Sequence, residues 1–301
     1  MQQSFFISML FALTLAQPVS AQSPDSLNQL KNHDFAVYYS VDHQQRAETT
    51  AQRIEKAMAY QQQLLRFKPT ITLFVLSVAD WKIYTSGMVY GMPHYDEKDN
   101  RLIVAAEDNP FWKSFLPPPD QLPAELRGPI QKAYITANGQ LSMQAFFDLL
   151  AVHELGHAFH IQGGLTMQRT WMGELFCNIL LHTYIAEKEP ELLPALTLFP
   201  RMVVAAGAKE FKFTTLQDVH QRYNEIGQQY PKNYGWYQCR WHSAAAGIYD
   251  TAGKQLCRKL WDALKSKKEK LTDEQLAAFL ETAADKSIAD MMRNWDRDTV
   301  K

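Results

Sequence analysis

The sequence is poor in cysteine, and it has no excess of charge of either sign. Its 301 residues include three cysteines, Cys177, Cys239 and Cys257, and its formal net charge is −1. An odd and sparse set of cysteines is not a disulfide framework, although a Cys239–Cys257 bridge and free buried thiols both stay open. No two cysteines have the spacing of a metal site. The balanced charge gives no electrostatic basis for binding nucleic acid or an anionic membrane.

Long apolar runs are also missing. After the N-terminal residues, no segment is long and apolar enough to predict a membrane span. Residues 5–19 are mostly apolar but too short and interrupted to cross a bilayer comfortably, and Val19-Ser20-Ala21 has the small residues of a cleavage site. We therefore expect a signal peptide over residues 1–21, cleaved after Ala21, and a secreted or periplasmic protein. The alternative is an uncleaved anchor, because residues 1–4 contain no Lys or Arg.

The composition predicts a folded protein with a sizeable core. Hydrophobic residues make up 46% of the chain and charged residues 21%, which argues against disorder, and the length suits one large domain or two closely packed ones. Strand and helix patterns alternate in the first half: strands are expected over residues 34–41, 69–78 and 101–106, with helices over 49–67 and 79–86. A Pro-rich loop is expected over 108–129, flanked by short helices at 109–116 and 129–135.

From residue 142 onward the pattern is almost entirely helical. Helices are expected over 142–161, 168–186, 200–208, 215–227, 237–250, 253–266, 272–284 and 287–295. The sequences Thr272–Gln275 and Ser287–Asp290 have the spacing of capping boxes. The fold class is therefore α+β, with an N-terminal part (22–140) built on a mixed sheet and a mainly helical part (141–301).

The most informative stretch is His153-Glu154-Leu155-Gly156-His157, which lies inside the first of these helices. On a helix, His153 and His157 are four residues apart and share a face, so both imidazoles can bind one Zn²⁺. Glu154 is next to the first ligand and close enough to deprotonate a water on the metal. The alternative is a chance match, but two His and one Glu in an apolar run need partners, and a metal supplies them.

Zinc in a catalytic site takes a third protein ligand and leaves a fourth position open. The best candidate is Glu174, on the next expected helix, with Asn178 four residues later and placed to orient His153. The alternative for Glu174 is a surface carboxylate at a helix start. His160 rotates away from the ligand face, and His182 is the reserve ligand.

These residues resemble the gluzincin metallopeptidases, the thermolysin-like and aminopeptidase-like group, whose motif is His-Glu-x-x-His with a Glu on the following helix. Sixteen residues separate His157 from Glu174, which is close to the family spacing. The resemblance covers residues 145–180, while 280–295 is similar to the closing helices of small secreted proteins of the peptidase-MA-like type. The Gly-x-Met-Glu-Asn segment that anchors a free amino terminus in aminopeptidases is absent, so aminopeptidase activity is not expected.

The resemblance implies two further parts of the site. One is an edge strand beside the metal helix that binds the substrate backbone, for which the hairpin from residue 91 to 106 is the candidate; an ordinary hairpin is the alternative. The other is a Tyr or His that stabilises the oxyanion. The region 233–242 is crowded with aromatic residues, and within it we expect Tyr237, with His242 behind it, to supply the donor. An aromatic core cluster is the alternative.

The sequence thus predicts a secreted zinc metallopeptidase, in which His153, His157 and Glu174 bind Zn²⁺ and Glu154 acts as the general base. Its expected partner is a peptide or protein substrate. Two other functions stay open: a hydrolase of a non-peptide amide with the same zinc site, and a non-catalytic zinc-stabilised binding protein. A purely structural zinc site has no need of Glu154.

Overall fold

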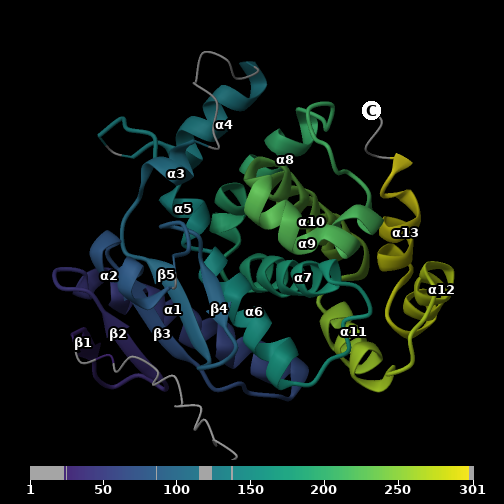
Figure 1. The fold of residues 1–301 in the computed structure, drawn as a ribbon, viewed down its shortest axis with the longest axis horizontal. Helices are drawn as coiled ribbons and strands as arrows, with labels where there is room; N and C mark the ends of the chain where they lie inside the picture. Colours follow the sequence, from purple (N-terminus) through teal and green to yellow (C-terminus); the bar gives the residue numbers. More distant parts are fainter. Residues whose placement is uncertain (1–23, 25, 86, 115–123, 137, 298–301) are drawn as a thin grey trace, which may run out of the picture.

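The protein is described from a computed structural model, which covers residue 24 and residues 26–85, 87–114, 124–136 and 138–297. The chain forms a five-stranded sheet in its first half and a mainly helical second half, so the predicted α+β class is confirmed (Figure 1). The predicted signal peptide and the Pro-rich segment 117–119 lie outside the described residues. No helix in the described part of the chain is long and apolar enough to cross a membrane.

The sheet is mixed, with the strand order β1-β2-β3-β5-β4. Its strands are β1 (Asn28–Leu30), β2 (Ala36–Tyr39), β3 (Thr72–Leu76), β4 (His94–Asp96) and β5 (Arg101–Ala105). The three central strands run parallel, while β1 and β4 pair antiparallel at the two edges. The strands expected at 34–41, 69–78 and 101–106 are β2, β3 and β5, whereas the three-residue β1 was not predicted.

Strands β3 and β5 are buried on both faces. In β3 and β5 only the first residue is partly exposed, so their apolar residues run continuously, as is usual for parallel strands covered on both sides. Helix α1 (Gln44–Leu65) packs against β2 and β3 and also contacts α6 (Leu150–Gln162), which lies beside β4 and β5. The helix that carries the His-Glu-x-x-His motif therefore stands between the sheet and the helical half.

The second half contains most of the helices. Besides α1 and α6, the described helices are α2 (Val78–Tyr84), α3 (Pro110–Lys113), α4 (Ala124–Tyr134), α5 (Gln144–Phe147), α7 (Trp171–Lys188), α8 (Leu193–Ala205), α9 (Leu216–Gln229), α10 (Pro231–Ala252), α11 (Gln255–Ser266), α12 (Asp273–Ala283) and α13 (Lys286–Asn294), with a 3₁₀ turn at Pro190–Leu192. The helix expected over 142–161 is divided into α5 and α6. Helix α10 begins six residues before the expected residue 237, because Pro231 is well suited to the first helical position.

One of the two predicted capping boxes is present. Thr272 and the residue three positions later cap α12 reciprocally. The box predicted at Ser287–Asp290 is wrong, because α13 begins earlier: the Asp285 side chain accepts the Ser287 backbone N–H at 2.9 Å, and Asp290 forms an ion pair with Lys286 instead.

Helix α7 is the centre of the helical half. Every residue from 171 to 185 is buried, because α1, α6, α8, α9 and α10 all pack around it. A helix surrounded in this way has to be apolar on all sides, and its few polar side chains need partners within the protein. All three cysteines are free and buried, so no Cys239–Cys257 bridge forms, and Cys257 Sγ lies 3.4 Å from Thr183 Oγ1.

Helix α6 approaches α7 closely at Gly156, inside the motif. A Cβ atom at this position would lie 2.9 Å from Cys177 Sγ and 3.0 Å from Cys177 Cα. Any larger residue would therefore have to push the two helices apart. The glycine of the motif therefore allows the part of α6 that carries His153 and His157 to lie close to α7.

We predict opposite effects of Ala at two helical glycines. Gly247, on α10, has open space around it, so Gly247→Ala should stabilise the protein by about 0.5–1 kcal/mol through helix propensity. Gly156→Ala should instead destabilise it by about 1–3 kcal/mol, because overpacking outweighs that gain. Urea unfolding of both variants measures the difference, and an equal stabilisation of both would contradict the close contact of α6 and α7.

Candidate metal centre

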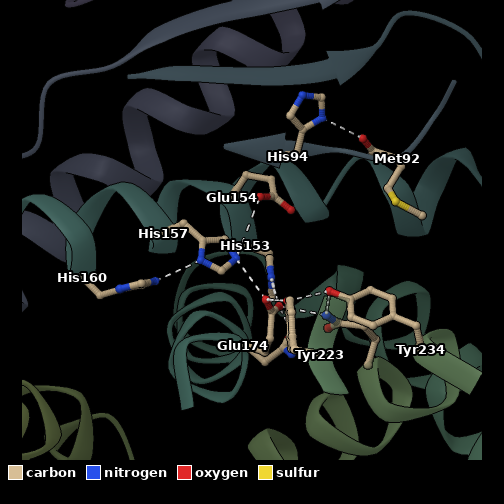
Figure 2. A network of polar contacts seen from close by, with 11 residues as sticks. Met92, His94, His153, Glu154, His157, His160, Glu174, Tyr223 and Tyr234 are labelled. Carbon is tan, nitrogen blue, oxygen red and sulfur yellow. Dashed lines mark hydrogen bonds and ion pairs between the residues drawn. The ribbon is translucent and has the colours of Figure 1, made fainter. Parts of the chain in front are cut away.

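Helix α6 places the three motif residues as the sequence predicts. The rings of His153 and His157 lie on one face with their centroids 5.0 Å apart, and both side chains line a cavity together with Glu154 (Figure 2). The cavity has a volume of about 780 Å³ and lies between the sheet edge and the helical half. The spacing of four residues therefore brings two imidazoles and one carboxyl group to the same wall of a cavity.

Glu174 enters this group from α7. Its Oε2 lies 3.1 Å from His153 Nε2, and its Oε1 lies 3.7 Å from His157 Nε2. The carboxyl group is buried, with 6% of the residue exposed. The structure thus brings together all three predicted ligands, with a carboxylate facing the Nε2 atoms of two imidazoles.

Each imidazole has a hydrogen-bond partner on its other nitrogen. His153 Nδ1 lies 2.9 Å from Asn178 Oδ1, and because this oxygen can only accept, Nδ1 donates. His157 Nδ1 lies 3.0 Å from His160 Nε2. Since a metal-binding Nε2 must offer its lone pair, Nδ1 of His157 then carries the hydrogen and donates to His160. The role predicted for Asn178 agrees with this geometry, whereas the contact of His160 was not predicted.

Three polar side chains from α9 and α10 complete the surroundings of Glu174. The Tyr223 hydroxyl donates to Glu174 Oε1 at 2.5 Å, and Gln238 Nε2 donates to Oε2 at 2.8 Å. The Tyr234 hydroxyl accepts a second hydrogen bond from Gln238 at 2.8 Å and lies 3.0 Å from the Tyr223 hydroxyl. Tyr223 has no sequence motif around it, so nothing in the sequence singles it out.

The two carboxyl groups of the site have pKa values that move in opposite directions. Burial, together with nearby Glu174, raises the pKa of Glu154 to about 8, although His153 and the backbone N–H of Tyr95 act in the opposite direction. For Glu174 the effect of burial is outweighed by His157 and His153 and by the hydrogen bond from Gln238, so its pKa falls well below the ordinary value. Such a separation assigns different tasks to two similar groups.

The imidazoles are also shifted by their surroundings. Burial lowers the pKa of His157 to about 4 and that of His160 to about 3, so both rings are neutral near pH 7. For His153 burial acts in the same direction, but the hydrogen bond that it donates to Glu174 and the charges of Glu154 and Glu174 outweigh burial and raise the pKa. The protonated form of His153 is therefore favoured. Its positive charge lies beside Glu174, in the position that a metal cation would take.

A second set of potential ligands replaces the carboxylate by Cys177. Its Sγ and one nitrogen each of His153 and His157 lie within 4.8 Å of one another. Cys177 is fully buried against Gly156 and does not line the cavity, and burial together with Glu174 and Glu154 raises its thiol pKa well above the usual range. Glu174 lines the cavity with the two histidines and Cys177 does not, so we favour Glu174 as the third ligand.

The oxyanion donor predicted at Tyr237 is wrong. The Tyr237 hydroxyl donates to the backbone oxygen of Thr215 at 2.8 Å, and its ring stacks on Trp295 with an angle of 8° between the planes, away from the cavity lining. Because α10 has 3.6 residues per turn, the cavity is instead lined from its other face, by Tyr234, Gln238 and His242. The alternative of an aromatic core cluster is correct for Tyr237.

The reserve ligand His182 lies elsewhere. It is not among the residues that line the cavity, and its ring packs against Tyr249 with centroids 5.4 Å apart. His242 does line the cavity, with its ring 6.2 Å from that of His153.

The hairpin formed by β4 and β5 provides the opposite wall. β4 is the edge strand of the sheet, and Tyr95 on it donates its backbone N–H to Glu154. At the C-terminal end of α6, Gln162 Nε2 donates to the Tyr95 hydroxyl at 2.8 Å and to the backbone oxygen of Thr70 at 2.7 Å. The predicted edge beside the metal helix is therefore present and is held to that helix at two points.

Comparisons of the chain with protein-family models, with curated proteins and with solved structures gave no match. The function is therefore argued from the residues of this site and their geometry.

We predict that the acceptor on His160 strengthens metal binding. His160→Ala leaves the Nδ1 hydrogen of His157 without its partner, so the affinity for Zn²⁺ should fall about 10- to 100-fold. Titration of metal-free protein against a zinc chelator measures this. His182→Ala is the matched control, because it also removes a buried histidine but touches no ligand, and it should keep the wild-type affinity. An unchanged affinity in His160→Ala would contradict the role of the His157–His160 contact.

We also predict which side chain is the third ligand. Glu174→Ala should lose stoichiometric zinc, whereas Cys177→Ala, three residues further along the same helix, should keep one zinc per chain. Metal analysis of both dialysed proteins decides between the two ligand sets. Zinc retained in Glu174→Ala and lost in Cys177→Ala would show that the thiol binds the metal.

Proposed function

We propose that this protein is a zinc-dependent metallopeptidase of the gluzincin type. The observation that carries the proposal is the Glu174 carboxylate facing the Nε2 atoms of His153 and His157, with the separate carboxyl group of Glu154 at the same cavity. Two imidazoles and one carboxylate are a known ligand set for catalytic zinc.

The residues present fit such an ion in three respects. Both imidazoles turn Nε2 toward the carboxylate, because their Nδ1 atoms are occupied by Asn178 and His160. The environment keeps Glu174 ionised, which is the form that binds a metal. The site also opens on one side to a cavity, which leaves room for water and substrate.

Glu154 is the proposed general base. It lines the cavity on the same helix as the two histidines but does not belong to the ligand set. When bound, a zinc ion polarises the scissile carbonyl, acidifies the attacking water and adds positive charge that favours ionised Glu154. Glu154 then accepts the proton of the attacking water and delivers it to the leaving nitrogen.

Tyr234 takes the place of Tyr237 as the proposed oxyanion donor. Its hydroxyl accepts a hydrogen bond from Gln238 and, because Tyr223 gives its only hydrogen to Glu174, donates its own to Tyr223; an oxyanion in the cavity would compete with Tyr223 for that hydrogen. Burial raises the pKa of Tyr234 far above the neutral range, so its hydroxyl keeps its proton and can donate it in a hydrogen bond.

The edge strand β4 is the proposed binding site for the substrate backbone. In an antiparallel ladder the N–H and C=O of one residue point to the same side. Because the Tyr95 N–H donates to Glu154 rather than to β5, its C=O also faces the cavity and is free to accept from a peptide N–H. An extended peptide can therefore add to this edge, with its scissile bond near Glu154.

A secreted or periplasmic location and a peptide or protein substrate are part of the same proposal. They rest on the N-terminal sequence and on the open edge strand. The lack of an aminopeptidase anchor segment favours cleavage within a chain.

We predict that Glu154→Gln separates metal binding from catalysis. The variant keeps the ligands, so it should bind one zinc per chain, but it loses the proton acceptor and should cleave a peptide about 10²- to 10⁴-fold more slowly. Zinc content and the rate of cleavage of an unstructured protein are the two measurements. A zinc-loaded wild type that cleaves neither this protein nor a peptide library would refute the peptidase proposal, and unchanged cleavage by Glu154→Gln would refute the role of Glu154.

A further inference from the structure

The part of the cavity near the start of α6 has a mostly aromatic lining, and we call this part the recess. The recess is lined by Phe146, Phe147, Leu150, Phe199, Cys239 and His242. Five of these six side chains are apolar. Such a lining accepts an apolar or aromatic side chain and disfavours a charged one, whose desolvation nothing would compensate.

His242 is the one imidazole in this recess. Only 7% of the residue is exposed, and its ring packs against Phe146 with centroids 5.5 Å apart. Within the described residues no group forms a hydrogen bond with His242, although it lines the cavity. The ring nitrogens of His242 are therefore open to the cavity, where a ligand hydroxyl could form a hydrogen bond with one of them.

The direction of β4 shows which part of a substrate meets the recess. Pro93, before β4, lines a small hollow together with Phe147 and Ala151, near the start of α6. Asn100, after β4, lies 3.2 Å from Gln162 at the end of α6. Strand β4 and helix α6 therefore run in the same direction. A peptide added antiparallel to β4 would place its C-terminal part over the start of α6, beside the recess.

We propose that the recess is a specificity pocket for the side chain that follows the cleaved bond, and that it selects tyrosine, whose phenol hydroxyl hydrogen-bonds to His242. This inference rests on the peptidase function proposed above. The aromatic ring of the substrate would pack against Phe146 and Phe199. Phenylalanine would fill the same space but leave His242 without a partner, so it is the sharpest comparison.

The first test uses two peptides that differ only in Tyr or Phe after the cleaved bond. The wild type should cleave the Tyr peptide with about tenfold higher kcat/KM, which is the effect of one well-made hydrogen bond. His242→Phe should abolish this preference, and His242→Gln, which keeps a donor and an acceptor, should retain part of it. An equal loss of kcat for both peptides in His242→Phe would show that His242 acts on the reaction itself, and it would overturn the specificity role.

A second test does not need turnover. In zinc-loaded Glu154→Gln protein, binding of p-cresol and toluene can be followed by the NMR signals of the His242 ring. The proposal requires that p-cresol binds about three- to tenfold more tightly than toluene, and that His242→Phe removes the difference. Equal binding of both compounds to the unsubstituted recess would refute the proposal. Selective p-cresol binding in a protein that cleaves no peptide would leave the recess assignment standing while the peptidase function fails.

Discussion

A carboxylate buried in the first turn of helix α7 has to be compensated by its surroundings, and much of the architecture follows from this requirement. Glu174 is surrounded by two imidazoles from α6, a hydroxyl from α9 and an amide from α10. The imidazoles reach it only because Gly156 lets α6 approach α7 closely. The raised pKa of His153 favours its protonated form, whose positive charge offsets part of the negative charge of Glu174. A buried anion with positive partners on one side and an open cavity on another is the arrangement that a metal ion would complete.

The second carboxyl group shows how position within one cavity separates two tasks. Glu154 is one residue from His153, yet its pKa rises to about 8, because burial and the charge of Glu174 outweigh its hydrogen bond from the backbone of Tyr95. A ligand must be ionised before the metal arrives, whereas a general base must accept a proton and release it near neutral pH. In the proposed function, Glu174 would meet the first demand and Glu154 the second, from neighbouring helices. Their division of labour comes from their environments and not from their chemistry.

Local periodicity explains which parts of the site can be predicted from the sequence. His153 and His157 share a helix face, and Glu174 follows on the next apolar helix. Pattern and spacing are therefore sufficient to predict that these three side chains lie together. Tyr223 comes from a distant helix, and only the tertiary packing brings it to the carboxylate. No motif distinguishes Tyr237 from the other aromatic residues of 233–242, and the sequence predicts that the helix begins only at residue 237. With the true start at Pro231, the face that carries positions 234, 238 and 242 points to the cavity, and Tyr237 lies on the other side. The edge position of β4 was expected only from the resemblance, because strand order depends on pairing across the sheet and local patterns do not show it.

Helix α10 links the site to the C-terminal end of the described chain. Its face opposite the cavity holds Trp295, which follows α13: the Trp295 ring stacks on Tyr237, its indole N–H donates to the backbone oxygen of Thr214, and Arg240 donates to its backbone oxygen. This attachment fixes the rotation of α10 about its axis, and so the direction in which Tyr234 points. The cavity walls thus come from an early hairpin and a late helix that meet only in the folded chain. The three proposed ligands come from α6 and α7 alone, so a metal ion bound by them would stabilise the packing of these two helices, and its binding free energy would contribute to folding.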